Sequence, residues 1–387
     1  MVGSPVPATL AATMADVSLD HTGRVAVVLG TRPEIVKLAG LVRLLGDRSW
    51  VVHTGQHYDA TLSDVFFAQF GLQPPTDALD VGGRTRGAQI GEATAALDAL
   101  FGDERPTAVV VQGDTNSALA GALAANAREL PLVHLEAGLR SHDRAMPEEH
   151  NRVLVDHIAD LCLAPTETSR ANLLAEGIPD ERIAVTGNTV VEAVRELLPG
   201  DEERAGLVAA HGVARDGFVL TTFHRPEIVD VADGLAEILG HLAALEVPVV
   251  LAVHPRLAAR VEGFGLGRLL DRLRPVPPLG YREFLGLFAE AALAVSDSGG
   301  LQEEASVVKR PVVVVRRSTE RPEVLGTFSV LAAVGPEIGD AAARWLADPA
   351  AVRRELANLP SPYGPGDAGE RSVAAMARMR MLDDSSK

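Results

Sequence analysis

The stretch ALAVSDSGGLQEEASVV, residues 292–308, combines three local signals that indicate one fold class. ALAVS is a short apolar run typical of a buried strand, DSGG is a turn, and LQEEASVV is typical of a helix start. A strand that turns directly into a helix is the unit of parallel α/β sheets. Free N–H groups at such a helix start attract phosphate. We therefore expect an anion site at Ser298, Gly299 and Gly300, with the glycines allowing close approach and unusual backbone angles.

Two glutamates follow the glycines. Glu303 falls in the first helical turn, where its carboxylate can cap free N–H groups. Glu304 is placed to accept hydrogen bonds from sugar hydroxyls. A plain glycine turn with acidic helix-start residues is the alternative explanation.

The same strand-turn-helix alternation recurs along the chain and predicts parallel, doubly wound sheets. The strand-like runs are RVAVVLG (24–30), WVVHTG (50–55), TAVVVQGDT (107–115), LVHLEAG (132–138), LCLAPT (161–166), FVLTTFH (218–224), VPVVLAVHP (247–255), LAVSDSGG (293–300) and RPVVVVRR (310–317). The alternation is interrupted over residues 186–217. We predict two Rossmann-like domains with a ligand held in the cleft between them.

The predicted organisation has four parts. They are a flexible leader at residues 1–22, an N-terminal domain at 23–190, a C-terminal domain at 191–365, and a final segment at 366–387 whose helix packs back on the N-terminal domain.

Charge and cysteine content exclude several classes of protein. The formal net charge of −16 argues against a nucleic-acid partner. No apolar window is long enough to span a membrane, and the leader lacks the features of a signal peptide. The single cysteine, Cys162, lies in an apolar run, which is typical of a buried residue in a reducing compartment. We expect a cytoplasmic protein.

Basic residues lie beside the predicted strand ends. GTRPEIVK places Arg32 and Lys37 about one helical turn apart, where both can reach one diphosphate; a solvated helix start is the alternative. Arg321 in TERPE lies between two glutamates, so it is either part of an ion-pair cluster or another phosphate contact.

Three carboxylates also follow predicted strand ends or helix starts. Asp114 ends the run VVVQGD, Glu136 ends VHLE, and Glu148 belongs to MPEEHNR, which also contains Arg152. Partial desolvation at such positions raises a carboxyl pKa toward values useful for acid–base catalysis. For each residue alone, a helix cap or a salt bridge is the alternative.

His224 in TTFHRPE and His254 in AVHPR end two further runs and are candidate donors to a diphosphate or a leaving oxygen, or else structural histidines. No H-E-x-x-H or cysteine–histidine spacing is present, so we expect no metal. GFGLGR (263–268) does not follow a strand and lacks the full dinucleotide fingerprint, so we expect no nicotinamide or other cofactor.

Ten segments, in order from about residue 25 to about residue 325, resemble the non-hydrolysing UDP-N-acetylglucosamine 2-epimerases. They are GTRPEIVKLAGL, TGQHYD, VQGDTNSALAGALAA, HLEAGLRS, MPEEHNR, APTETSRANLLAEG, VTGNTVVEAV, VHPR, SDSGGLQEEA and TERPE. The resemblance implies a GT-B-like fold with UDP bound mainly by the C-terminal domain. It also implies a cytoplasmic homodimer that supplies precursors for cell-surface polysaccharide or glycoconjugates.

The resemblance implies a reaction as well: reversible epimerisation at C2 of UDP-GlcNAc to UDP-ManNAc, by elimination of UDP to 2-acetamidoglucal and re-addition. The implied catalytic residues are Asp114, Glu136, Glu148 and His224. The implied substrate-binding residues are Arg32, Lys37, Arg140, Arg152, His254, Ser298, Gly299, Gly300, Glu304 and Arg321.

Two departures from the family pattern bear on regulation. Ile228 replaces an amide, and Tyr58, Asp59 and Ala60 replace the Arg-Glu-Met that many bacterial members carry beside their regulatory UDP-GlcNAc site. We predict weak or absent activation by UDP-GlcNAc. The alternative activities are 2-epimerisation of a related UDP sugar such as a 2,3-diacetamido uronic acid, a hydrolysing epimerase, and a GT-B glycosyltransferase.

Overall fold

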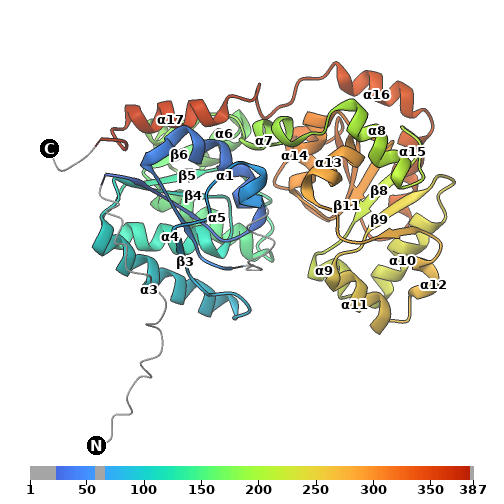
Figure 1. Ribbon diagram of the computed structural model, residues 1–387, viewed down its shortest axis with the longest axis horizontal. Coiled ribbons are helices and arrows are strands. Elements are labelled where there is room, and N and C mark those ends of the chain that lie inside the picture. Colours follow the sequence, from blue (N-terminus) through green and yellow to red (C-terminus); the bar gives the residue numbers. More distant parts are fainter. Residues whose placement is uncertain (1–22, 57–65, 384–387) are drawn as a thin grey trace, which may run out of the picture.

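The computed structural model of the protein describes residues 23–56 and 66–383. The expected leader, residues 1–22, lies outside the described residues, as do Tyr58, Asp59 and Ala60. Two all-parallel sheets lie side by side, each packed between helices (Figure 1). The predicted class, two doubly wound α/β domains, is confirmed.

The first sheet has the strand order β3-β2-β1-β4-β5-β6-β7. Its strands are β1 (Val25–Leu29), β2 (Ser49–His53), β3 (Asp77–Ala78), β4 (Ala108–Gln112), β5 (Leu132–Leu135), β6 (Leu161–Ala164) and β7 (Ile183–Val185). Its helices are α1 (Arg32–Leu45), α3 (Arg86–Glu104), α4 (Asn116–Ala127), α5 (Pro147–Ile158) and α6 (Glu167–Ala175).

The second sheet has the order β10-β9-β8-β11-β12-β13. Its strands are β8 (Val219–Thr222), β9 (Val249–Ala252), β10 (Arg274–Val276), β11 (Leu293–Ser296), β12 (Val312–Val315) and β13 (Ser329–Ala332). Its helices are α9 (Pro226–Val229), α10 (Ala232–Ala243), α11 (Pro255–Gly263), α12 (Gly267–Leu270), α13 (Tyr281–Glu290), α14 (Gly300–Val308), α15 (Pro336–Leu346) and α16 (Pro349–Ala357).

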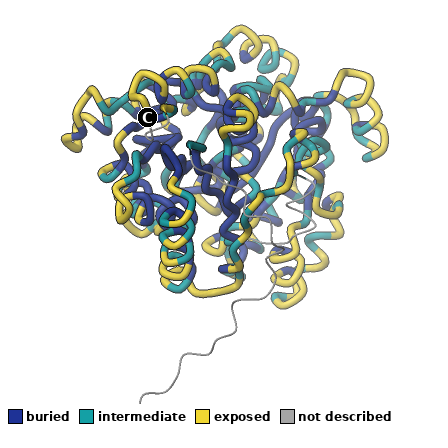
Figure 2. Tube along the Cα trace, turned by 60° about the vertical axis from the view of Figure 1, so that its left-hand side comes forward, coloured by how far each residue is buried: buried dark blue, intermediate teal, exposed yellow. Residues whose placement is uncertain are grey.

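The central strands form the core of each half. Every residue of β1, β4, β11 and β12 is buried, because helices cover both faces of a parallel sheet. Figure 2 shows this as buried strands inside a shell of exposed helical turns. Cys162 on β6 is fully buried in the core of the first half, as the sequence predicts.

The chain passes between the halves twice. α7 (Val190–Leu197) and α8 (Asp201–Ala210) lead into the second half, and α7 packs against both α1 and α14. After α16 the chain returns to α17 (Ala368–Arg378), which lies against α1 (Figure 1). The domain boundaries at residues 190 and 365 stay predictions.

No helix within the described residues is both long enough and apolar enough to cross a membrane.

Candidate active site

Each sheet has a switch point, where the strand order reverses. In the first sheet this lies between β1 and β4, and in the second between β8 and β11. Ligands of doubly wound sheets bind beyond the carboxyl ends of the strands at such points. Arg32, the first residue of α1, and Asp114 lie there in the first half, and His224 and Ser298 lie there in the second. The positions predicted from the sequence therefore lie where the fold favours a ligand.

A buried ion pair joins the two halves beside these loops. Lys37 on α1 lies 2.5 Å from a carboxylate oxygen of Glu136 and 2.8 Å from one of Glu303 on α14. Asn188 donates its amide to the same two carboxylates, at 2.7 and 3.2 Å. Lys37 therefore holds two carboxylates together and does not stand free beside Arg32. The predicted capping role of Glu303 is wrong, because its carboxylate points into this junction and α14 has no side-chain cap.

Three more residues extend this contact. The Nε of Arg321 donates to Glu303 at 2.7 Å, its Nη1 donates to Glu320, and Arg316 donates to Glu320 at 2.9 Å. The sequence left two explanations for Arg321, and the structure agrees with the one in which it belongs to an ion-pair cluster. We call Lys37, Glu136, Glu303, Arg316, Glu320 and Arg321 the ion-pair network; its three cations balance its three carboxylates.

The charges of this network set the pKa of Glu136. Burial raises the pKa of this carboxyl, but the ammonium of Lys37 and the guanidinium of Arg321 outweigh burial and hold the pKa below its usual range. The upward shift expected for Glu136 is therefore wrong, and the residue is ionised at neutral pH. Its backbone has a φ of 67°, which a non-glycine residue rarely adopts and which is common at functional sites.

The other two predicted acid–base residues lie at the neighbouring strand end and helix start. Asp114 follows β4 and accepts a hydrogen bond from Arg152, which also donates to Glu149 at 2.8 Å. Glu149 further accepts the backbone N–H groups of residues 141 and 142, at 3.0 and 2.9 Å. The half-buried Glu148 side chain has no hydrogen bond or ion pair with any described residue. Of the three predicted acid–base residues, Glu148 is therefore the one without a hydrogen-bonding or ionic partner among the described residues.

Arg140 is a supporting residue in this arrangement. Its side chain is buried and pairs with Asp156 at 2.7 Å and Glu176 at 2.6 Å. Asp156 also accepts from His134, at 2.6 Å, and from the backbone N–H of Gly138, at 3.1 Å. These bonds hold the loop that carries Glu136. All hydrogen bonds of Arg140 within the described chain are internal to the first half.

Across the junction, Asp297 organises the carboxyl end of the second sheet. This fully buried carboxylate accepts the backbone N–H groups of His224 and Arg225 at 2.9 and 2.8 Å, and lies 3.1 Å from Nδ1 of His224. Burial raises the pKa of Asp297, but these hydrogen bonds and the charge of His224 lower it overall. His224 is oriented in this way while 45% of its side chain stays exposed.

His254 lies beside His224, with 6.3 Å between the ring centroids. Nδ1 of His254 accepts the backbone N–H of Arg256 at 3.2 Å and caps α11. Burial, together with the charges of His224 and Arg32, lowers the pKa of His254. A neutral ring whose Nδ1 accepts a hydrogen bond carries its proton on Nε2, so His254 can donate to an anion. Arg32 itself has no hydrogen bond or ion pair with the described part of the chain.

Gly299, which directly precedes α14, lies where a larger residue would not fit. A Cβ atom on Gly299 would lie 2.8 Å from Glu320 and 2.9 Å from Arg321, whereas one on Gly300 would meet nothing within 4 Å. The unusual backbone angles predicted here are wrong: Gly299 has a φ of −66°, and neither glycine has a positive φ. The N–H of Ser298 is used internally, donating to Ser296 at 3.1 Å.

Glu304, the predicted sugar contact, accepts a hydrogen bond from the Tyr281 hydroxyl at 3.0 Å. Burial, with a contribution from Glu303, raises the pKa of Glu304 to about 7. The residues that sequence reasoning missed are Asn188, Asp297 and Arg316, as well as the pairing role of Glu303. Their only local signal was position, since Asp297 and Arg316 directly follow apolar runs. The partners come from distant segments.

Ile228, where the family usually has an amide, is buried in the apolar core of the second half. Its side chain therefore packs into that core.

Comparisons with known proteins extend over most of the chain. The profile of a family described as UDP-N-acetylglucosamine 2-epimerase matches residues 47–377. A UDP-N-acetylglucosamine 2-epimerase of Methanocaldococcus jannaschii is 38% identical over 362 residues, which cover 90% of this chain and 98% of that relative. A UDP-2,3-diacetamido-2,3-dideoxy-D-glucuronate 2-epimerase of Pseudomonas aeruginosa is 36% identical over 310 residues, covering 78% of this chain and 86% of the relative.

A solved structure agrees with the family profile and with the relatives. The crystal structure of the M. jannaschii UDP-GlcNAc 2-epimerase in complex with UDP-GlcNAc and UDP superposes with a TM-score of 0.83 and 37% sequence identity, covering 92% of this chain and 99% of that one. With the profile and the relatives, this shows that the chain belongs to the UDP-N-acetylglucosamine 2-epimerase family of isomerases.

Proposed function

We propose that this protein interconverts UDP-GlcNAc and UDP-ManNAc by elimination and re-addition of UDP. One observation carries the proposal. Lys37 joins Glu136 of the first half to Glu303 of α14, so carboxylates of the first half lie beside the helix start of the second half, where His224 and His254 also follow strands. An elimination needs both, because a proton must move at C2 while a diphosphate leaves from C1.

In the proposed reaction, the C1–O bond breaks and its electron pair leaves with the UDP β-phosphate. A carboxylate removes the C2 proton, whose C–H electrons form the C1=C2 bond of 2-acetamidoglucal. In the return step, a proton from another acid adds to the opposite face of C2 with the electrons of the C1=C2 bond, and the phosphate oxygen attacks C1. No net oxidation occurs, so the proposal includes no redox cofactor.

The geometry suggests a division of roles among the carboxylates. Glu148, which has no internal partner among the described residues, and Asp114, held by Arg152, move the protons. Glu136 stays ionised between Lys37 and Asn188 and stabilises positive charge that develops at C1. Arg140 and Arg152 act as supports.

The phosphate roles fall to the second half and to Arg32. We propose that Ser298, Gly299, Gly300, Arg32, His224 and His254 bind the diphosphate, with His224 assisting the leaving oxygen. Glu304 binds the ribose. Lys37 and Arg321 act through the ion-pair network, which holds the two halves at the site. A homodimeric, cytoplasmic enzyme that supplies glycoconjugate precursors completes the proposal.

The test is incubation of the purified protein with UDP-GlcNAc alone in deuterated water, followed by proton NMR. We expect UDP-ManNAc that carries deuterium at C2, without added nicotinamide. Product that keeps its original C2 hydrogen would contradict the mechanism. Release of free sugar and UDP would instead indicate a hydrolysing epimerase.

A second candidate substrate is a UDP-2,3-diacetamido uronic acid, which the Pseudomonas aeruginosa relative favours. A parallel NMR time course with that sugar separates the two, since the true substrate is expected to turn over much faster.

A further inference from the structure

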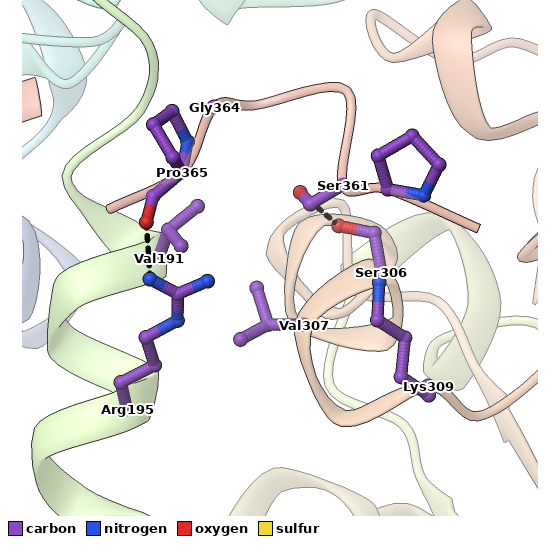
Figure 3. Close-up of a pocket in the computed structure, with 9 residues that line it drawn as sticks. Val191, Arg195, Ser306, Val307, Lys309, Ser361, Gly364 and Pro365 are labelled. Atoms are coloured by element: carbon purple, nitrogen blue, oxygen red, sulfur yellow. Dashed lines mark hydrogen bonds between the residues drawn. The ribbon is translucent and has the colours of Figure 1, made fainter. Parts of the chain in front are cut away.

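A cavity of about 370 Å³ lies where both passages between the halves meet α14 (Figure 3). Its walls are α7 with Val191 and Arg195, the end of α14 with Val307 and Lys309, and the segment after α16 with Ser361. The proposed diphosphate site is at the opposite, N-terminal end of α14. Eight helical rises of about 1.5 Å separate the two ends of α14 by about 12 Å, so the cavity is a separate place.

Two cations line this cavity without a carboxylate partner in the described residues. Arg195 donates one N–H to the carbonyl of Pro365, and Lys309 donates to the carbonyl of Leu359 at 2.6 Å. Figure 3 shows both side chains reaching from opposite walls toward the loop above, with Val307 between them. A guanidinium has five N–H donors and an ammonium three, so most of their donors are left for a ligand.

The positive charges of Arg195 and Lys309 repel each other. Burial and the positive charge of Arg195 lower the pKa of Lys309. The loop lies close over the guanidinium, because Gly366, at a φ of 90°, leaves no Cβ where Arg195 lies. A bound anion would relieve the repulsion between the two cations.

The remaining lining fits a small ligand with polar and apolar parts. The hydroxyls of Ser306 and Ser361 hydrogen-bond at 2.8 Å on one side, and Val191, Val307 and proline rings form the rest. Ser306 donates its hydroxyl hydrogen to the carbonyl of Glu303, and Ser361 donates to Ser306. A phosphate here would therefore accept its hydrogen bonds from Arg195 and Lys309.

We propose that this cavity binds a small phosphate, either inorganic phosphate or a phosphate monoester, and that the bound anion ties both interdomain passages to α14. The ligand would bridge Arg195 on the outgoing passage and Lys309 on α14, beneath the returning loop of residues 358–366. It would therefore slow the local opening of these segments.

The experiment measures hydrogen exchange by mass spectrometry on the full protein, with and without inorganic phosphate at constant ionic strength, and again with glycerol 3-phosphate. We expect slower exchange in residues 187–198 and 358–366. The variant Arg195→Gln/Lys309→Gln should raise the phosphate concentration needed for half-maximal protection about tenfold or more, because it loses charge-assisted hydrogen bonds. Stronger protection by glycerol 3-phosphate than by inorganic phosphate would identify the ligand as a phosphate monoester. Equal protection by the two would identify it as inorganic phosphate.

The matched control is Arg268→Gln/Arg272→Gln, which removes two exposed positive charges elsewhere in the second half. It should keep the wild-type response. No protection in these segments, or equal loss in both variants, would overturn the proposal. If the double variant folds poorly, Lys309→Gln alone keeps the bond from Arg195 to Pro365 and must still weaken the response. No UDP sugar is present, so the result is independent of the proposed activity.

Discussion

The ion-pair network and the carboxyl end of the second sheet differ in what neutralises their charges. In the network, three buried cations already contact three carboxylates. At the second sheet, His224 stays 45% exposed and His254 donates no internal hydrogen bond within the described residues. Neighbouring Arg32 is similarly free of partners in the described chain. We therefore expect substitutions in the network to cost stability first, and substitutions of His224, His254 or Arg32 to weaken ligand binding with little cost in stability.

The largest effect is expected from breaking the network. Arg321→Met leaves Glu303 and Glu320 without their shared cation, and removing one partner of a buried ion pair costs about 3–5 kcal/mol. Urea denaturation should show a matching fall in the free energy of unfolding. Arg317→Met, which changes an exposed neighbour, is the control and should leave it unchanged. Equal midpoints for Arg321→Met and wild type would mean that the network is not stabilising.

A comparable effect, on activity alone, is expected at Glu148. Glu148→Gln keeps the shape and removes ionisation, so turnover should fall by about 10² or more, the scale of a general acid or base. The adjacent Glu149→Gln weakens bonds to Arg152 and Ser141 and should lower the melting temperature as well. Melting temperature and turnover are measured on the same samples. A folded Glu148→Gln protein with near-normal turnover would place the chemistry elsewhere.

Glu34 sharpens the comparison because it is as buried as Glu136 but has only neutral partners. It accepts from the Gly30 N–H at 3.0 Å and the Thr115 hydroxyl at 2.7 Å, and burial raises its pKa from 4.5 to about 7. Below pH 4.5 the folded and unfolded states both hold the proton. Between that pH and about 7 only the folded state holds it, so stability falls as pH rises, by about 3 kcal/mol.

The check is the unfolding free energy of wild type relative to Glu34→Gln at both ends of this pH window. The unfolding free energy of the wild type minus that of Glu34→Gln should fall by about 3 kcal/mol as pH rises from 4.5 to about 7, whereas the exposed control Glu262→Gln should show no such trend. A constant difference would mean that Glu34 is ionised in the folded protein.

The smallest effects are expected at the two glycines. Gly299→Ala pushes a methyl group against Glu320 and Arg321 and should cost about 1–3 kcal/mol of stability. Gly300→Ala meets no neighbour, so stability should hold while UDP affinity falls about tenfold, equivalent to about 1.4 kcal/mol. Calorimetric titration with UDP measures the affinity. Unchanged UDP binding by Gly300→Ala would show that phosphate does not approach the start of α14.

The strands that the sequence did not reveal are the sheet edges. β3, β7, β10 and β13 lie at the four ends of the two strand orders, and each is only partly buried. An edge strand has one neighbour and needs no continuous apolar run. The central strands, such as VVVV in β12, are buried on both faces and therefore carry an apolar pattern that a single sequence reveals.

The sequence by itself determined the fold class and the positions of the strand ends that bear Asp114, Glu136, His224 and Ser298. These follow from local order, because apolar runs, turns and helix starts are set by neighbours along the chain. Only the tertiary structure decided the ionisation of Glu136 and the partner of Glu303. Lys37, Glu136 and Glu303 lie far apart along the chain, yet their charges meet within 2.8 Å. A carboxyl pKa depends on the balance between burial and nearby charge, and that balance exists only once both halves are folded together.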